Sequence, residues 1–339
     1  MEILVIRFSS LGDLVTLEPT FRALRHFHRD DRITFVTSQI GKELYDDTGY
    51  FDRIVVERGD RHGRLLRRTR AVRAELGKPR FDIIYHLQTS RFSHLLTLWL
   101  RKDRVVHIAA SAWQKLFSIK VRFRPAAELL RAAGFGAAAI AAYLRDDGHQ
   151  KITLGVDPQR AESFRLRLTE AGGARPVIAL APGASARWVS KQWGNDHFAE
   201  LAAKLQHAGS QVIVVGSELE TAAAQRIQQR ANQALDFTGQ TSIGDLKALF
   251  VNTDVFIGND SGPAHIAAAV GTATVTLFAP TAELHCVKHM PYRGSHVCFS
   301  PEGGFCRTCY EPDCPTSRAC MASISVERVF QATIELGKL

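Results

Sequence analysis

The stretch Ile257-Gly258-Asn259-Asp260-Ser261-Gly262-Pro263-Ala264-His265 lies between two apolar segments of different character. Residues 253–256 are typical of the end of a buried β-strand, and the small apolar residues 266–271 are typical of a tightly packed helix. A strand, a glycine-bounded turn and a helix start bring backbone N–H groups and the positive helix end to one point, which can bind phosphate without a metal. The same residues also fit a helix cap with a tight turn and no ligand. The rest of the chain favours the phosphate site.

Length and composition indicate a globular protein of two domains. The chain has 339 residues, more than one ordinary domain holds, and it is 45% hydrophobic and 23% charged. It enters a strand pattern directly at Glu2, which argues against a secretory signal, and its longest apolar tract, 134–144, is too short to cross a bilayer. We therefore expect a soluble intracellular protein.

The positive charge is confined to the first half of the sequence. Residues 1–150 carry 26 Lys and Arg against 17 Asp and Glu, whereas residues 151–339 carry 17 of each. The basic residues are densest from Arg58 to Arg80. This segment fits a solvated arginine-rich helix, or a surface for an anionic membrane, an anionic substrate or nucleic acid. Nucleic acid ranks last and we expect none as a partner, because the segment lacks interleaved aromatic residues and any recognised nucleic-acid motif.

Strands and helices are expected to alternate along the chain, which predicts parallel sheets with helices on both faces. Strands are predicted at 2–8, 32–37, 53–56, 81–86, 105–108, 176–181, 211–215, 254–257 and 273–278. Pro19 must start a fresh helix or kink the first one. The fold class is thus α/β with two doubly wound, Rossmann-like domains, each with a glycine turn after its first strand. Ligands lie beyond the carboxyl ends of such strands, so we expect one in a cleft between the domains.

Three separated loops of this arrangement resemble one known family. They are Ser9-Ser10-Leu11-Gly12-Asp13, then Pro182-Gly183-Ala184-Ser185 with Lys191-Gln192-Trp193, and the stretch 258–265; residues 237–241, Phe-Thr-Gly-Gln-Thr, add to the match. Together they resemble the heptosyltransferases of glycosyltransferase family 9, over nearly the whole chain and in order. The resemblance implies the two-domain GT-B architecture. We place an acceptor-binding domain at 1–156, a nucleotide-sugar domain at 157–325, and a last helix at 326–339 that packs back on the first domain.

The resemblance also implies an activity. The family transfers L-glycero-D-manno-heptose from ADP-heptose to the inner core of lipopolysaccharide, with inversion of the anomeric centre and with no catalytic metal or other cofactor. It implies an anionic lipid A–core acceptor, carrying Kdo or heptose, and peripheral contact with the cytoplasmic face of the inner membrane. Two alternatives stay open: a protein or capsule acceptor, and a nucleotide-sugar-binding module without catalysis.

Site residues follow from the matching positions. Asp13 matches the catalytic base of the family, and its residue type suits removal of a proton from the acceptor hydroxyl; a helix cap is the alternative. The donor-binding candidates are Ser185, Arg187, Lys191, Glu218, Glu220, Asp260, Ser261, Gly262 and His265, with the choice between Glu218 and Glu220 open. The weaker acceptor-binding candidates are Ser10, Gly12, Arg61, His86, Gln88 and Arg91. His86 stands where many relatives carry Asp, so the acceptor sugar is undetermined.

All six cysteines lie in the C-terminal part of the chain, from Cys286 to Cys320. Cys306, Cys309, Cys314 and Cys320 begin with the spacing of a metal knot, but the later gaps are short for a zinc ribbon. An intracellular address argues against disulfides. We expect reduced structural thiols rather than a metal site.

Overall fold

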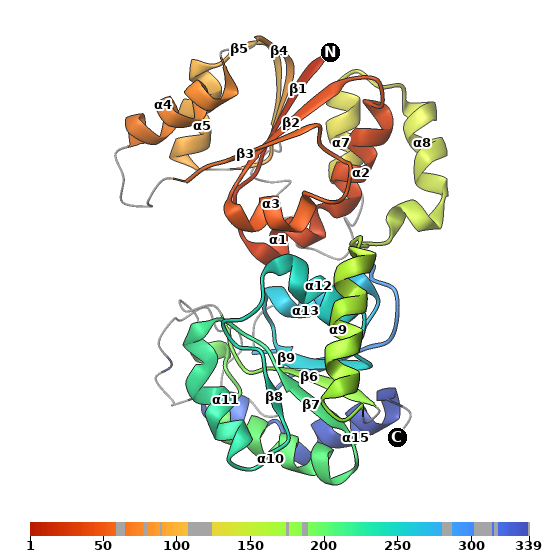
Figure 1. The fold of residues 1–339 in the computed structure, drawn as a ribbon. Helices are drawn as coiled ribbons and strands as arrows, with labels where there is room; N and C mark the ends of the chain where they lie inside the picture. The colour runs from red at the N-terminus through yellow and green to blue at the C-terminus, as the bar shows by residue number, and fades with distance from the viewer. Residues whose placement is uncertain are drawn as a thin grey trace. The chain divides into compact units, whose positions relative to one another are not determined.

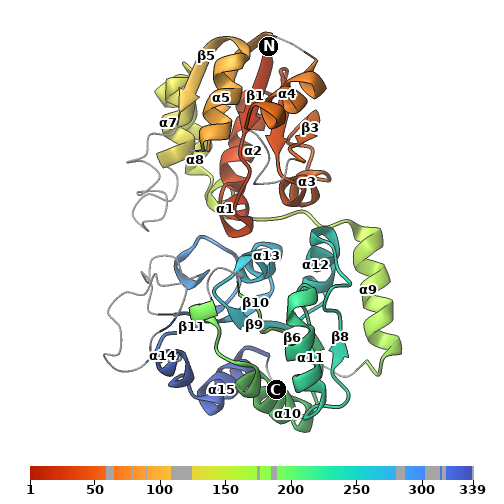
Figure 2. The ribbon, with the colours of Figure 1, turned by 90° about the vertical axis from the view of Figure 1, so that its left-hand side faces the viewer.

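In the computed structural model, the first strand, β1 (Glu2–Ile6), is buried along almost its whole length. Such a continuous apolar run is typical of a parallel strand with helices on both faces. The described residues are 1–58, 65–77, 80–88, 90–107, 124–173, 176–184, 189–279, 287–301, 314 and 318–337. They form two units, Met1–Ile152 and Thr153–Leu339 (Figures 1 and 2).

The first unit holds a parallel sheet in the order β3-β2-β1-β4-β5. Its other strands are β2 (Arg32–Thr37), β3 (Arg53–Val56), β4 (Arg80–His86) and β5 (Arg101–His107). The helices are α1 (Leu11–Thr16), α2 (Glu18–Phe27), α3 (Gln39–Tyr45), α4 (Leu65–Leu76), α5 (Arg91–Trp99), α7 (Arg124–Ala132) and α8 (Ala137–Arg145). Pro19 lies in the first turn of α2, so it starts a fresh helix.

Both faces of this sheet are covered by helices (Figure 1). On one face, Val72 of α4 and Phe92 of α5 pack on Leu4 and other inward-facing strand residues. On the other, Phe21 of α2 lies 5.3 Å from Phe35 of β2 between ring centroids. The amphipathic helices and apolar strands therefore enclose two core layers, as a doubly wound sheet requires.

The second unit holds a six-stranded parallel sheet in the order β11-β10-β9-β6-β7-β8. Its strands are β6 (Val177–Ala181), β7 (Gln211–Val214), β8 (Leu235–Asp236), β9 (Val255–Asn259), β10 (Ala273–Leu277) and β11 (His296–Phe299). The helices are α9 (Pro158–Glu170), α10 (Asn195–His207), α11 (Thr221–Gln228), α12 (Ile243–Phe250), α13 (Gly262–Val270), α14 (Ala319–Ala322) and α15 (Val326–Gly337). Residues of α10, α11, α14 and α15 bury one face of the sheet, while α12 and α13 pack together beside α9.

The last helix belongs to the second unit. From the sequence we placed residues 326–339 in a separate segment that packs back on the first domain. In the structure α15 packs against α10, β9 and β10, and Val326 and Val329 are part of the core of the second unit. The division between the units lies at Ile152, four residues before the sequence-based boundary at 156.

Each sheet has one point where the order of the strands reverses. In the first unit the chain runs outward from β1 to β3 and returns to β4 beside β1. In the second it runs outward from β6 to β8 and returns to β9 beside β6. Loops that leave neighbouring strands at such a point diverge to opposite faces, which leaves a crevice at the carboxyl ends. The two candidate sites follow these strand pairs.

Candidate functional site

The loops after β6 and β9 are joined by the side chain of Asn259. This amide is fully buried and donates hydrogen bonds to the carbonyls of Pro182 at 2.7 Å and Gly183 at 3.1 Å. Its oxygen accepts a bond of 3.0 Å from the backbone N–H of Trp193. One side chain thus fixes the glycine loop, the segment before α10 and its own strand end.

Lys191 and Asp260 form an ion pair beside this junction. Lys191 Nζ lies 2.8 Å from Asp260 Oδ2, and both side chains are mostly shielded from solvent. Lys191 ends a single 3₁₀ turn, and Asp260 follows the last residue of β9. Trp193, two residues on, is buried and donates its indole N–H to the carbonyl of Ile324, so its side chain anchors the loop in the second unit. The lysine is therefore held in place at the carboxyl edge of the sheet.

The start of α13 faces the same edge. Ser261 is its N-cap and Gly262 its first residue. Pro263 has no N–H, and the N–H of Ala264 donates to the carbonyl of Ser261 at 3.2 Å, so Gly262 is the helix residue of this turn whose N–H has no partner among the described residues. The hydroxyl of Ser261 is buried without a hydrogen-bond partner among the described residues. His265, one turn into α13, is hydrogen-bonded through Nδ1 to the hydroxyl of Tyr292 at 2.7 Å. Burial, and secondarily the Asp260 carboxylate, raises the pKa of Tyr292 well above its usual value, so this hydroxyl stays protonated.

Glu218 and Glu220 lie in the loop after β7 and differ in environment. Glu220 accepts hydrogen bonds of 2.7 Å from the N–H and the hydroxyl of Ser217. A Cβ at Gly183 would lie 2.5 Å from its Oε1, and one at Gly216 would lie 2.8 Å from its Cβ, so the Glu220 side chain occupies space that only glycines leave open. Glu218 is exposed and packs on the turn at Gly239. Of the two acids, Glu220 lies next to the glycine loop.

In the first unit, Asp13 lies at the carboxyl end of β1. It is the third residue of α1 rather than its N-cap, and the N-cap is Ser10. Its Oδ2 accepts a bond of 3.0 Å from the backbone N–H of Ser10 and one of 2.9 Å from Arg7 Nη2. Its Oδ1 accepts no hydrogen bond from a described residue, and the side chain keeps 27% exposure. One oxygen is therefore fixed while the other is accessible.

Arg7, which the sequence reasoning did not single out, holds the Asp13 carboxylate. Its side chain is 6% exposed, and besides Asp13 it donates to the carbonyl of Leu87, the residue after β4, at 2.9 Å. Burial lowers the pKa of Arg7, and the Asp13 carboxylate opposes that shift because it favours the charged guanidinium. The arginine thus ties the base candidate to the neighbouring strand.

The structure separates the acceptor candidates. Gln88 accepts a bond of 3.2 Å from the N–H of Phe8, which places it beside the Asp13 loop, where Ser10 and Gly12 also lie. His86 is buried, with its ring 4.7 Å from that of His94. Arg91 is exposed at the start of α5. Arg61 and the donor candidates Ser185 and Arg187 lie outside the described residues.

The cysteine prediction is wrong at one position. Cys298 is disulfide-bonded, whereas reduced thiols were expected. Cys314 and Cys320 are not in disulfides; the sulfur of Cys314 accepts a bond of 3.2 Å from the N–H of Arg318. Cys306 and Cys309 lie outside the described residues. No group of three or more His, Cys, Asp or Glu arranged to hold a metal is found within the described ranges.

Comparison with known proteins assigns the chain to a family. The family model for glycosyltransferase family 9 (heptosyltransferase) matches residues 69–317, well over half of the sequence. The chain belongs to glycosyltransferase family 9. It is therefore a glycosyltransferase, as the three loops indicated.

Relatives in this family support the assignment over different lengths. Lipooligosaccharide heptosyltransferase 2 of Campylobacter jejuni is 23% identical over 336 residues, which covers 97% of this chain and 96% of the relative. Lipooligosaccharide heptosyltransferase 2 of Haemophilus influenzae is 33% identical over 139 residues, so that match spans only 39% of this chain and 40% of the relative. The solved structure of E. coli ADP-heptose lps heptosyltransferase II has a TM-score of 0.70 at 18% identity, covering 99% of this chain and 98% of that one.

The structural likeness concerns the fold. It confirms an α/β protein of the GT-B type with two Rossmann-like units. No helix in the described parts of this family 9 member is both long enough and apolar enough to span a membrane.

Proposed function

We propose that this family 9 member transfers L-glycero-D-manno-heptose from ADP-heptose to the inner core of lipopolysaccharide, inverting the anomeric centre without a catalytic metal. The observation that carries the proposal is where the polar residues lie in the two sheets. Asp13, a carboxylate with one accessible oxygen, follows β1 at the point where the strand order of the first sheet reverses. Lys191 and Asp260 lie in the loops after β6 and β9, where the strand order of the second sheet reverses. The names of the relatives and of the solved structure agree with this substrate class.

The second unit supplies the donor site in this proposal. Lys191 and the N–H of Gly262 at the positive end of α13 offer positive potential to the diphosphate, while Ser261 offers a hydroxyl. Glu220, packed against the glycine loop, is the acid we assign to the ribose hydroxyls. As the bond from the anomeric carbon to the diphosphate breaks, the leaving ADP gains charge, and fixed donors stabilise it because they need not reorganise.

The first unit supplies the base. The acceptor hydroxyl oxygen forms the new bond to the anomeric carbon, and its proton passes to Oδ1 of Asp13. Arg7 and the N–H of Ser10 hold Oδ2, so the accessible oxygen keeps one orientation. Attack from the face opposite the departing ADP inverts the centre. A positioned base of this kind contributes roughly 10²–10⁴ in rate.

The basic surface of α4 supports an anionic acceptor at a membrane. Arg67 and Arg70 are exposed, and Arg73 is partly exposed, on a helix whose buried side faces the core. Each basic residue near an anionic leaflet contributes about 1 kcal/mol of attraction. We therefore propose peripheral contact with the cytoplasmic face of the inner membrane, as an anionic lipid A–core acceptor requires.

Transfer from ADP-heptose to defined truncated core acceptors, followed by mass spectrometry, tests the proposal. We expect one added heptose, and loss of turnover by at least about 10²-fold in Asp13→Asn with ADP affinity retained. Asp30→Asn is the matched control, because that carboxylate is exposed in the same unit and pairs only with Arg29 among the described residues. Normal turnover in Asp13→Asn would remove Asp13 from the mechanism.

The same assay separates the alternatives. Transfer to a protein or capsule acceptor, with no transfer to lipid core, would show that the acceptor is a protein or capsule and not lipopolysaccharide. Tight ADP-heptose binding without transfer to any acceptor would indicate a non-catalytic module.

A further inference from the structure

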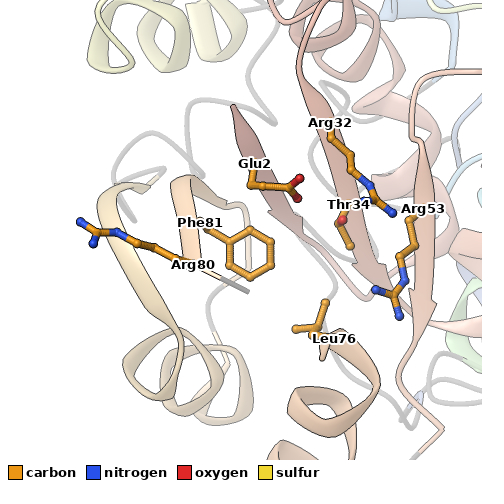
Figure 3. A pocket seen from close by; sticks show the side chains of 7 residues that line it. All are labelled: Glu2, Arg32, Thr34, Arg53, Leu76, Arg80 and Phe81. Carbon is orange, nitrogen blue, oxygen red and sulfur yellow. The ribbon is translucent and has the colours of Figure 1, made fainter. Parts of the chain in front are cut away.

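The opposite edge of the first sheet carries a cavity that the transfer reaction does not use. It has a volume of about 310 Å³ and is lined by Glu2, Arg32, Thr34, Arg53, Leu76, Arg80 and Phe81 (Figure 3). Glu2, Arg32, Arg53 and Arg80 are the first residues of β1, β2, β3 and β4. The cavity therefore lies at the amino ends of these strands, whereas Asp13 follows the carboxyl end of β1. Its volume is at the lower limit of small-molecule sites.

Strand register places opposite charges side by side in this cavity. Glu2 is paired with Arg32, and Thr34 with Arg53, in adjacent parallel strands. Paired residues on parallel strands about 4.8 Å apart point to the same face. Glu2 and Arg32 nevertheless form no ion pair, and neither side chain has a polar partner among the described residues. The space between them is therefore open to a ligand that contacts both.

Thr34 is the third polar side chain of this cavity without a partner among the described residues. It is 4% exposed overall, lines the cavity, and its hydroxyl makes no hydrogen bond with a described residue. Thr34 Oγ1 is not among the buried polar atoms that lack a partner in the described residues, so the hydroxyl is exposed within the cavity and can donate a hydrogen bond to a ligand oxygen.

The remaining lining residues determine which charges face a ligand. Figure 3 shows Arg80 extending away from the other side chains, in agreement with its ion pair to Asp103. Arg53 donates through Nη2 to the carbonyl of Glu75 at 2.5 Å, which leaves its other donors available. The rings and methyl groups of Phe81 and Leu76 form an apolar wall (Figure 3).

We propose that this cavity binds a small phosphate ester that carries a hydroxyl group. The phosphate is held by Arg32 and Arg53 with the hydroxyl of Thr34, since guanidinium groups bind phosphate oxygens in charge-assisted pairs. The Glu2 carboxylate accepts a hydrogen bond from the ligand hydroxyl, and the carbon skeleton contacts Phe81. A free sugar or polyol phosphate and a glycerophosphate lipid headgroup share this chemistry.

The test uses glycerol 3-phosphate with the full chain, measured by calorimetry beside inorganic phosphate and glycerol. The Lys191→Ala background weakens the proposed donor site, and phosphate binding that depends on Arg32 in this background belongs to the cavity. We expect saturable binding of glycerol 3-phosphate that weakens about tenfold or more in Arg32→Gln. Arg29→Gln is the matched control, because Arg29 is 82% exposed in the same unit.

Glu2→Gln provides an independent readout. Removing its negative charge should strengthen the binding of inorganic phosphate. The ratio of the affinity for glycerol 3-phosphate to that for inorganic phosphate should fall, because the ligand hydroxyl loses a charged acceptor. If Glu2 had only a structural role, Glu2→Gln would change the affinities for inorganic phosphate and glycerol 3-phosphate by the same factor. Equal binding in Arg32→Gln and Arg29→Gln, or no saturable binding of either phosphate, would overturn the proposal.

Vesicles distinguish the two sources. Sedimentation with phosphatidylcholine vesicles, with and without phosphatidylglycerol, is compared for wild type and Arg32→Gln. If Arg32→Gln lowers the phosphatidylglycerol-dependent binding, the ligand is a lipid headgroup. If Arg32→Gln weakens only the binding of free glycerol 3-phosphate, the ligand is a soluble phosphate ester.

Discussion

Replacing Asn259 with alanine should loosen the whole donor side of the second unit. The change removes three hydrogen bonds, to the carbonyls of Pro182 and Gly183 and from the N–H of Trp193. Each bond contributes about 1 kcal/mol net, and the site is fully buried, so water cannot easily replace them. We expect the free energy of unfolding to fall by about 3 kcal/mol, which lowers Tm by roughly 6–12 °C for a unit of this size.

Asn252→Ala is the matched control in the same unit. Asn252 donates to the carbonyls of Ala161 at 2.8 Å and Ala248 at 2.9 Å, but it is half-buried. Water can replace part of these bonds, so we expect a loss of about 1 kcal/mol. The structure gives Asn252 no contact with the glycine loop or the Lys191 segment among its hydrogen bonds, so it should leave nucleotide affinity unchanged.

Thermal unfolding and ADP titration at a temperature where both variants are folded separate stability from function. Asn259→Ala should bind ADP at least about tenfold more weakly, because the loops that hold the diphosphate lose their common anchor. Asn252→Ala should bind ADP as wild type does. If Asn259→Ala were destabilised as expected yet kept full ADP affinity, the idea that this amide organises the donor loops would be refuted.

Three further predictions concern Lys191, the glycine loop and two buried or half-buried histidines. Lys191→Ala should weaken ADP-heptose binding about tenfold or more, whereas Lys204→Ala, which breaks an exposed pair with Glu327, should not; equal affinities by titration would contradict the phosphate assignment. Gly183→Ala should displace Glu220 from Ser217 and lower the free energy of unfolding by about 1–2 kcal/mol, and the added Glu220→Ala change should cost less there than in wild type, as a double-mutant cycle in urea would measure. Burial lowers the pKa of His28, against the opposing effect of Asp31, and burial also lowers that of His296. The unfolded chain therefore binds more protons below about pH 6.5, and stability should fall as pH drops from there; a flat profile down to about pH 5 in urea titrations would contradict this.

Local sequence patterns were sufficient to predict those strands whose formation depends on residues close together in the sequence. Strands 32–37 and 53–56 were predicted with their observed bounds, because apolar patterns and flanking turn residues mark them. The two-residue strand β8 and the strand β11 were not predicted, since such short segments carry little periodic signal. The alanine-rich helix α8 was also missed: its residues were noted only as an apolar tract, although alanine is the strongest helix former.

The site shows a similar limit. The glycines, acids and lysine of the three loops were visible as motifs because their chemistry is local. The roles of Arg7 and Asn259 were not, because each acts on carbonyls about 80 residues away along the chain. A charged residue between apolar residues of the strand predicted at 2–8 was the one signal for Arg7. The burial of the polar side chain of Asn259 is known only from the fold.

The packing of Glu220 against two glycines constrains how this sequence can diverge. A side chain at Gly183 would collide with the carboxyl group of Glu220, whereas one at Gly216 would lie 2.8 Å from the Cβ of Glu220, an atom that every residue except glycine carries. A substitution at 183 therefore becomes tolerable once residue 220 has shrunk, but a substitution at 216 does not. In a set of aligned homologues, a larger residue at position 183 should be accompanied by a short side chain at 220, while position 216 should stay glycine.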